Sequence, residues 1–576
     1  MSTSSSKSSM TEKPSHDYDN YSKIHSFIGL RGEKLNLAVS VLSGVGFLLF
    51  GYDQGVMGSL LTLPSFRETF RQIDVTTHPE NSVLQGAVIA LYEIGCMISA
   101  LSTMYFGDKL GRRKLIFIGS VIMLIGGVIQ SCAYTVAHLT VARIITGFGN
   151  GFITATVPIW QAELAKPKMR GKLIMLQGSI IALGITISYW VDFAFYFLDK
   201  PGASYASVSW RFPIAFQCIF PIIIIPFIFK LPESPRWLLK KERREEARIV
   251  FSAIYEVPLD DHLVHASIEE IEQSIAMEVR EGADKFNFKS LLSQGESKNF
   301  QRTMIAAWSQ IMQQITGINL ITYYAGTIFE QYIGMPPLQS RILAACNGTE
   351  YFLASLLAFW TIERFGRRKL MLFGAAGQAI SMAILTGCNH KADPTNSGNS
   401  VDHKAGIAAA VFLFVFNSFF GCTWLGISWL LPPEILPLGI RAPATGISTA
   451  CNWGFNFMVV MITPVAFSNI GAYTYSIFAV INFLMIPAVY FFFPETAGRS
   501  LEEMDIIFAQ TPANQPWKSV SIARSLPYMH AGANNNEDIE NKRHAFAEHR
   551  ENISIEEGSG NIPPLLEPNE DTGKAH

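Results

Sequence analysis

The sequence predicts an all-α membrane protein with twelve transmembrane helices, arranged as two pseudo-symmetric six-helix bundles joined by a cytoplasmic helical linker. Three observations predict this fold. Only 16% of the 576 residues are charged, against about 25% in soluble domains, and the mean hydropathy is +0.24. Apolar runs of membrane-spanning length recur in two sets of six, and short motifs of the first set return in the second.

Each apolar run is long enough for a membrane-spanning helix, which needs about 20 residues at a rise of about 1.5 Å each. The runs cover 35–63, 83–106, 114–134, 136–160, 173–198, 210–231, 302–330, 339–362, 369–388, 405–431, 442–466 and 470–493. The charged stretch between the sets has periodic apolar positions, which predict amphipathic helices. The predicted segments are a disordered N-terminus (1–34), the first bundle (35–231), the linker (232–301), the second bundle (302–493) and a mostly disordered tail (494–576).

Lysine and arginine gather in the short loops after the second, fourth and eighth runs. These loops contain residues 107–114, 166–172 and 363–369, and the loops of the other parity hold fewer cations. Because cytoplasmic loops of membrane proteins carry the excess of positive residues, we expect both termini and the linker in the cytoplasm. The protein is expected to be a multi-pass protein of the plasma membrane.

Three pairs of motifs repeat between the bundles, at offsets of 255, 271 and 262 residues. They are GDKLGRRK at 107–114 with ERFGRRK at 363–369, the Glu–Arg pairs Glu163/Arg170 and Glu434/Arg441, and PESPR at 232–236 with PETAGR at 494–499. A nearly constant offset indicates a duplicated unit that keeps its orientation. In such parallel repeats the solute site lies between the halves near the middle of the membrane.

The charged residues of these repeats predict a gate at the cytoplasmic side. Arginines at helix ends can form forked hydrogen bonds to the carboxylates of neighbouring motifs. On this interpretation the ion pairs latch the cytoplasmic side while a cavity faces outward, and then break. The alternative is that the cations only mark the topology. The predicted gate residues are Arg112, Arg113, Glu163, Arg170, Glu233, Arg367, Arg368, Glu434, Arg441 and Glu495.

An acidic residue lies inside the first apolar run. Asp53 belongs to the glycine-rich stretch 46–58 (GFLLFGYDQGVMG), and Arg143 in the fourth run is its candidate partner. A charge at the membrane centre costs roughly 2.5–3.5 kcal/mol on insertion scales, so Asp53 is expected to face protein or water. A nearby guanidinium favours the charged carboxylate and an apolar cavity favours the neutral one, so making and breaking the pair would drive proton uptake and release. A static pair that positions two helices is the alternative.

Amide and aromatic side chains in the second bundle predict a site for a small neutral solute. Neutral amides both donate to and accept from hydroxyl groups, and tryptophans could cover the apolar face of a pyranose ring. Interhelical amide packing is the alternative for each residue alone. The predicted solute contacts are Gln177, Gln313, Gln314, Asn319, Tyr324, Trp429 and Asn452, and Gly317 is expected to permit local unwinding.

The sequence contains no pattern that indicates catalysis. A phosphate-binding glycine loop, a zinc spacing and a nucleophile elbow are all missing, and the seven cysteines occur singly. We therefore expect no enzyme activity, no cofactor and no metal. A net charge of −2 gives no reason to expect nucleic acid as a partner.

These motifs together resemble the sugar porter family of the major facilitator superfamily, and within it the fungal branch of the yeast glycerol–proton symporter. The matching stretches are 51–55, 107–113, 158–163, 232–236, 313–319, 363–368 and 494–498. The resemblance implies alternating access and a monosaccharide or polyol substrate. It also implies hydroxyl contacts from Gln313, Gln314, Asn319, Trp429 and Asn452, and proton coupling by Asp53 and Arg143.

From both lines of reasoning we expect a functional monomer that imports a monosaccharide, hexose or pentose, together with a proton. A glycerol or polyol–proton symporter, a facilitative hexose uniporter and, last, a non-transporting sugar sensor are the alternatives. The expected partners are therefore a small neutral sugar or polyol, a proton and the lipid bilayer.

Overall fold

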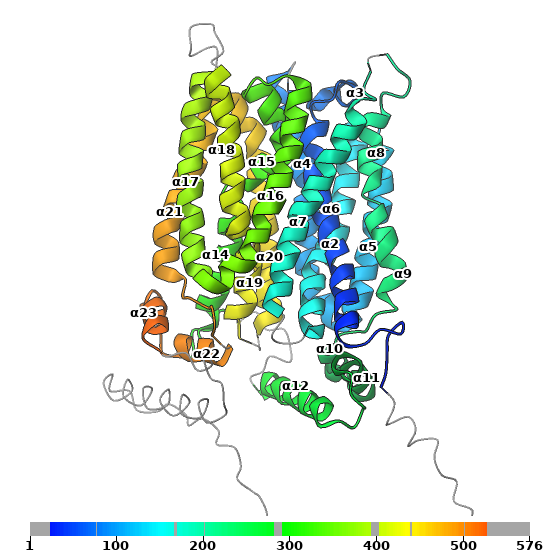
Figure 1. Cartoon of the computed structure of the whole chain (residues 1–576), viewed down its shortest axis with the longest axis vertical. Coiled ribbons are helices and arrows are strands. Elements are labelled where there is room, and N and C mark those ends of the chain that lie inside the picture. The colour runs from blue at the N-terminus through cyan, green and yellow to red at the C-terminus, as the bar shows by residue number, and fades with distance from the viewer. Residues whose placement is uncertain are drawn as a thin grey trace, which may run out of the picture.

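Long helices running side by side form the body of the molecule, and short helices gather at one end (Figure 1). The computed structural model describes residues 24–75, 78–165, 170–200, 202–280, 291–295, 297–392, 403–437, 440–499 and 501–526. Within these ranges no strand occurs, and an isolated bridge joins Phe27 to Leu30.

The first half contributes six spans, the last of which consists of two helices in succession. The spans are α2 (Gly32–Leu60), α4 (Ser82–Leu110), α5 (Arg112–Ser131), α6 (Val136–Leu164), α7 (Arg170–Tyr196), and α8 (Val208–Phe216) followed by α9 (Ile219–Ile228). Each corresponds to one of the first six apolar runs.

The second half also contributes six spans, two of which are interrupted. The spans are α14 (Asn299–Ile315) followed by α15 (Ile318–Thr327), α16 (Pro337–Phe365), α17 (Arg367–Ala392), α18 (His403–Cys422) followed by α19 (Trp424–Ile435), α20 (Arg441–Ile470) and α21 (Tyr473–Phe492). The first break lies at Gly317, whose φ of +94° is in the left-handed region that glycine adopts without a steric cost. A short π-helix (Ile328–Tyr332) follows α15.

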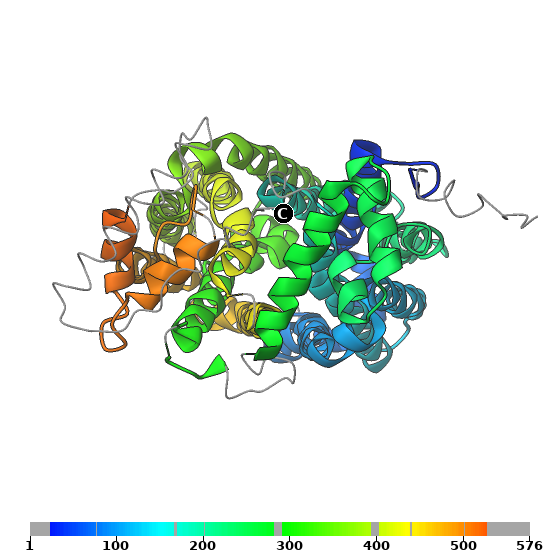
Figure 2. The ribbon, with the colours of Figure 1, turned by 90° about the horizontal axis from the view of Figure 1, so that it is seen from below.

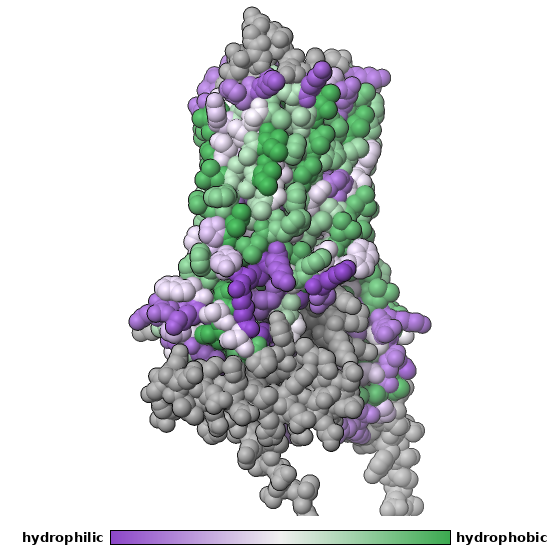
Figure 3. Space-filling model, turned by 60° about the vertical axis from the view of Figure 1, so that its left-hand side comes forward, coloured by the Kyte–Doolittle hydropathy of each residue, from purple (hydrophilic) through white to green (hydrophobic). Residues whose placement is uncertain are grey.

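The outside of the bundle is apolar over the height of a membrane. Figure 3 shows a largely green band of hydrophobic residues between two purple, hydrophilic ends. Large exposed side chains such as Trp360, Phe373 and Phe483 belong to its helices. Ten helical segments in the described ranges are long and apolar enough to cross a membrane, and the two other spans, α6 and α14–α15, hold buried polar groups. The predicted twelve-span fold is confirmed.

Short helices mark the two ends of the bundle. The linker end carries α10 (Pro235–Lys240), α11 (Arg244–Tyr255) and α12 (His262–Arg280), and the opposite end, which we call the far end, carries α3 (Pro64–Thr69). Seen from below, the linker helices lie under the first half, whereas α22 (Leu501–Ala509) and α23 (Lys518–Ser525) lie under the second (Figure 2). Disorder is expected for residues 1–34 and for most of 494–576. Of these, residues 1–23 and 527–576 lie outside the described part of the chain, and the remainder includes the start of α2, α22 and α23.

Glycines bring the helices of the first half into close contact. A Cβ atom on Gly51 of α2 would collide with the carbonyl oxygen of Ile181 on α7, and one on Gly147 of α6 would collide with the carbonyl oxygen of Tyr92 on α4. Small residues are the usual means of close helix packing in membranes. Here they hold the helices that carry Asp53 and Arg143 in fixed positions.

Candidate functional site

A fully buried ion pair joins α2 and α6 in the first half. Arg143 Nη1 lies 3.6 Å from Asp53 Oδ2, and neither side chain is exposed. Arg143 Nη2 donates to the carbonyl oxygen of Ile89 at 2.9 Å, and the guanidinium lies 4.8 Å from the centroid of the Tyr92 ring. Neither Asp53 oxygen has a partner at good hydrogen-bond geometry among the described residues, and the Arg143 guanidinium and the Tyr92 side chain are the groups that interact with the carboxylate.

A cavity lies between the two halves. Its free volume is only about 30 Å³, far below the roughly 300 Å³ of the smallest small-molecule sites, so the side chains of the two halves nearly close it in this conformation. The first half contributes one amide, from Gln54, and the second half contributes three. The lining residues are Phe50, Gln54, Ile181, Ile185, Gln313, Gln314, Ile318, Asn319, Thr322, Tyr351, Phe420, Leu425 and Trp429. A hollow with four amides and aromatic walls suits a small polar solute that has some apolar surface.

The amides of the second half form a connected chain across the break at Gly317. Asn319 Nδ2 donates to Gln314 Oε1, and Gln314 Nε2 donates weakly to Gln313 Oε1 at 3.4 Å. Gln313 Nε2 in turn donates to the carbonyl oxygen of Leu425 at 3.0 Å, which ties the chain to α19. The break therefore places amides of α14 and α15 side by side on one wall.

Four of the seven predicted solute contacts line this cavity, namely Gln313, Gln314, Asn319 and Trp429. The other three make contacts elsewhere. Gln177 donates to Gln161, the hydroxyl of Tyr324 donates to the carbonyl oxygen of Val460, and Asn452 donates to Gln310 and Gln313. Asn452 therefore stabilises the position of Gln313, whose side-chain amide has partners at both its oxygen and its nitrogen.

Sequence reasoning did not identify two polar residues of this region. Gln54 lines the cavity, and its position directly after Asp53 in a glycine-rich helix was the available signal. The second is Glu93 of α4, an acid inside an apolar run that belongs to none of the repeated motifs. In the structure it accepts a hydrogen bond from the hydroxyl of Tyr323, a residue 230 positions away in the other half.

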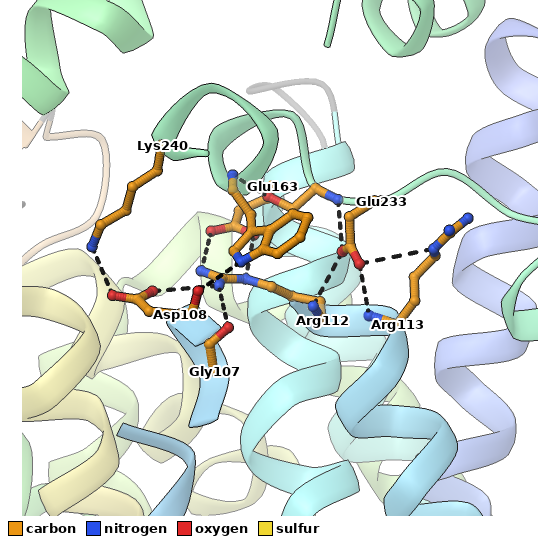
Figure 4. A network of polar contacts seen from close by, with 9 residues as sticks. Gly107, Asp108, Arg112, Arg113, Glu163, Glu233 and Lys240 are labelled. Carbon is orange, nitrogen blue, oxygen red and sulfur yellow. Dashed lines mark hydrogen bonds and ion pairs between the residues drawn. The ribbon is translucent and has the colours of Figure 1, made fainter. Parts of the chain in front are cut away.

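At the linker end, charged residues of the first half form one network (Figure 4). Arg112 makes a forked contact with Glu163, with two hydrogen bonds of 3.1 Å. Glu233 accepts hydrogen bonds from the backbone N–H groups of Arg112 and Arg113, both at 3.2 Å, at the N-terminus of α5. A helix N-terminus favours a bound anion in this way. Burial raises the pKa of the Glu233 carboxyl, and the backbone N–H groups of Ser234 and Arg113 oppose that shift.

The second half repeats this network. Arg367 Nη2 lies 2.9 Å from Glu434 Oε1, and Glu495 accepts from the backbone N–H groups of Arg367 and Arg368 at 2.8 and 3.1 Å. Gly111 and Gly366 precede the two arginine pairs with φ values of +86° and +82°. The repeated motifs therefore fold into repeated structures.

Eight of the ten predicted gate residues belong to these two networks. Arg441 donates to the carbonyl oxygen of Leu436, and Glu434 pairs with Arg367 instead of with Arg441. The side chain of Arg170 lies outside the described part of the chain. The ion pairs of each network join helices of the same half.

Between the halves, hydrogen bonds lie toward the far end. Arg341 Nη2 donates to Thr62 Oγ1 at 2.7 Å, and the hydroxyl of Tyr189 donates to the carbonyl oxygen of Thr322 at 2.5 Å. Toward the linker end the halves meet through methionine side chains on glycines, with Met175 against Gly426. The two ends of the interface thus differ in chemistry.

Comparison with known proteins adds the following findings. Residues 39–508 match the family described as "Sugar (and other) transporter". The chain is 40% identical to the "Sugar transporter STL1" of Saccharomyces cerevisiae over 91% of both chains. It is 36% identical to the "Major facilitator superfamily transporter mfsA" of Aspergillus fumigatus over 87% of this chain and 91% of that one. It is 30% identical to the "Hexose transporter HXT13" of S. cerevisiae over 83% of both.

Solved structures show the same fold. The xylose transporter XylE from E. coli, in a partially occluded inward open conformation, has a TM-score of 0.66 and 25% identity, and covers 81% of this chain and 99% of its own. The proton:xylose symporter XylE bound to 6-bromo-6-deoxy-D-glucose has a TM-score of 0.69 and 26% identity, and covers 83% and 100%.

Proposed function

The chain belongs to the sugar transporter family of the major facilitator superfamily, and on that premise we propose that it imports a monosaccharide together with a proton by alternating access. The observation that carries this proposal is the buried pair of Asp53 and Arg143 in the first half, next to an amide-lined cavity between the halves. Sugar transport follows from the family. Monosaccharide as the substrate and proton coupling are the proposed steps.

The cavity supplies the groups that bind solute. Gln313, Gln314 and Asn319 form hydrogen bonds with one another, and sugar hydroxyls can replace those partners because they donate and accept as amides do. Trp429 offers an apolar face on the same lining. A solute that bonds to the amides of α14 and α15 and also to Gln54 of the first half would draw the two halves together, which favours closure around the solute.

The ion pair supplies the coupling. Protonation of Asp53 removes the negative charge that faces Arg143, and the guanidinium then keeps only the carbonyl of Ile89 and the face of Tyr92. The contact between α2 and α6 therefore loosens when a proton is bound. If the ion pair is closed in one of the two forms, outward- or inward-facing, and open in the other, proton binding and release are coupled to the movement of the halves.

Location and gating complete the proposal. The lysine and arginine bias places the linker end in the cytoplasm, and the protein acts as a monomer in the plasma membrane. The two arginine–glutamate networks hold the linker end of each half together and serve as the cytoplasmic gate. The forked contact of Arg112 with Glu163 and the contact of Arg367 with Glu434 support that role.

One observation favours another member of the same class. Arg143 also contacts Ile89 and Tyr92, and these contacts favour an ion pair that stays closed throughout the transport cycle. A pair that stays closed takes up no proton, which would make the protein a facilitative uniporter.

Transport by the purified protein in liposomes with an imposed pH gradient tests the proposal. We expect the wild type to accumulate a labelled monosaccharide when the outside is acidic, and Asp53→Asn to lose accumulation while it keeps solute exchange. Accumulation by Asp53→Asn would disprove the coupling role. Uptake by the wild type without proton movement would identify a uniporter, and competition between a panel of sugars and glycerol would identify the substrate class.

A further inference from the structure

Glu93 is a buried acid with a partner in each half of the molecule. Its side chain on α4 is fully buried, and it interacts electrostatically with Arg143 and Asp53 of the first half. One carboxylate oxygen accepts a hydrogen bond from Tyr323 of the second half, and the other, Oε2, is buried with no hydrogen-bond partner among the described residues. Arg143 itself bonds to Ile89, one helical turn before Glu93.

The charges of this cluster do not balance. Asp53 and Glu93 are two carboxylates, and within the described ranges Arg143 is the one guanidinium that faces them. The other titratable groups that interact with Glu93 are neutral, namely Tyr92 and Cys96 on its own helix and Tyr323 on α15. From α20, the uncharged Trp453 packs edge-on against Tyr92. An unpaired charge in a buried site is expensive unless it is neutralised. The two carboxyl groups therefore share one proton. Glu93 holds it when Asp53 is ionised and paired with Arg143, and Asp53 holds it when Glu93 is ionised.

Tyr323 connects this cluster to the solute cavity. It lies on α15, the helix that begins after the break at Gly317 and carries Asn319 and Thr322 of the cavity lining. Hydrogen bonds to an ionised carboxylate are roughly twice as strong as bonds between neutral groups. The bond between Tyr323 and Glu93 is therefore tight when Glu93 is ionised and weak when it is protonated.

We propose that Glu93 shares the coupling proton with Asp53, and that its hydrogen bond with Tyr323 transmits the protonation state to the solute-binding helix α15. This inference rests on the proton symport proposed above. A second proton entering the cluster leaves both carboxyl groups neutral, so Glu93 is no longer ionised in any fraction of the molecules. Its bond to Tyr323 then weakens and α15 is released from α4. Glu93 is thus a proton-binding residue of the coupling site, and Tyr323 is a positioning residue that acts through it.

Two conservative variants test the proposal by opposite effects on the pH dependence of uptake. Glu93→Gln removes a negative neighbour from Asp53, so proton binding weakens and half-maximal uptake moves about one pH unit toward acid. The solute KM at neutral pH then rises about tenfold and returns toward the wild-type value at acidic pH. Tyr323→Phe removes the donor that favours ionised Glu93, so half-maximal uptake moves toward alkaline pH.

The experiment uses the full chain in liposomes with a labelled monosaccharide over a series of external pH values. Glu350→Gln is the matched control, because Glu350 is also a membrane-embedded carboxylate with a hydroxyl donor, Ser418, but lies in the second half away from this cluster. Its pH profile is expected to match the wild type.

The outcomes separate the two proposals. Opposite shifts for Glu93→Gln and Tyr323→Phe support the inference, and Tyr323→Phe alone tests it if Glu93→Gln does not fold. Proton-coupled uptake by the wild type with unshifted profiles, or with shifts in the same direction, would overturn the role of Glu93 and leave symport intact. No proton movement in the wild type would remove the symport proposal itself.

Discussion

The two halves share a frame but differ around the cavity. Both carry a glycine with positive φ, an arginine pair and a glutamate that caps the following helix, 233 in the first half and 495 in the second. Next to the cavity, the first half buries Asp53, Glu93 and Arg143, whereas the second half supplies Gln313, Gln314 and Asn319. The repeated networks at the linker end position the helices of both halves in the same way, whereas the side chains near the cavity differ between the halves.

This difference assigns separate tasks. Charged groups exchange protons, and neutral amides exchange hydrogen bonds with hydroxyl groups, so each half has the chemistry for one substrate. Tyr323 and Glu93 form a direct hydrogen bond between the two sets. Substitutions in the two halves should therefore have effects of different size and kind.

The largest effect is expected from Arg143→Leu. The change leaves Asp53 and Glu93 buried without a cation, and removing one partner of a buried pair costs about 3–5 kcal/mol. Thermal unfolding of the purified protein should show a large loss of stability. The double variant Arg143→Leu with Asp53→Asn should recover much of it, and equal stability of the single and double variants would show that the charges do not interact.

A smaller effect is expected from the repeated ion pairs at the linker end. Glu163→Ala removes two charge-assisted hydrogen bonds from Arg112, and Glu434→Ala removes one from Arg367. Both carboxylates are partly exposed, so each loss is about 1–2 kcal/mol, with Glu163→Ala the larger. Each variant should populate one of the two forms, inward-facing or outward-facing, more than the wild type does. The rate at which a cysteine introduced into the cavity reacts with a reagent added on each side of the membrane measures this shift. Unchanged transport with normal surface expression of Glu434→Ala would contradict a gating role.

In the amide half, Asn319→Ala should weaken solute binding without affecting the proton. A neutral hydrogen bond contributes about 0.5–1.5 kcal/mol, which corresponds to a roughly three- to tenfold higher KM. The pH at which uptake is half-maximal should stay at the wild-type value. A shifted pH profile would show that Asn319 also affects proton binding, and would contradict the separate tasks of the two halves.

The smallest effect is expected from Gln177→Ala. This amide is buried in the first half, but it bonds to Gln161 and does not line the cavity. The KM should change less than about twofold, because no solute hydrogen bond is lost. A KM change as large as that of Asn319→Ala would mean that Gln177 enters the cavity in another state of the cycle.

The spans and the repeats could be predicted from the sequence because membrane-spanning helices need long apolar runs. The arginine and glutamate motifs repeat in sequence, and their networks repeat in structure, as Arg112 with Glu163 and Arg367 with Glu434 show. The pairing of Asp53 with Arg143 was also predictable, since buried charges in a membrane need partners.

Which amides face the cavity could not be predicted. That depends on how α14 and α15 rotate about the break at Gly317, and the rotation is set by packing against other helices. The partner of Glu93 was hidden for a related reason, because Tyr323 lies in the other half and no repeat links the two positions. Gln177 and Gln161 are 16 residues apart on different helices, and only their crossing brings them together.

The uneven interface between the halves has a consequence for the temperature dependence of the transport cycle. Opening the far end requires direct hydrogen bonds, such as those of Arg341 and Tyr189, to be exchanged for water. Opening the linker end requires flexible thioether side chains, such as that of Met175, to slide off glycine surfaces. The interface between the halves should therefore contribute less to the activation enthalpy of solute exit toward the linker side than to that of the return of the empty carrier to its outward-facing form.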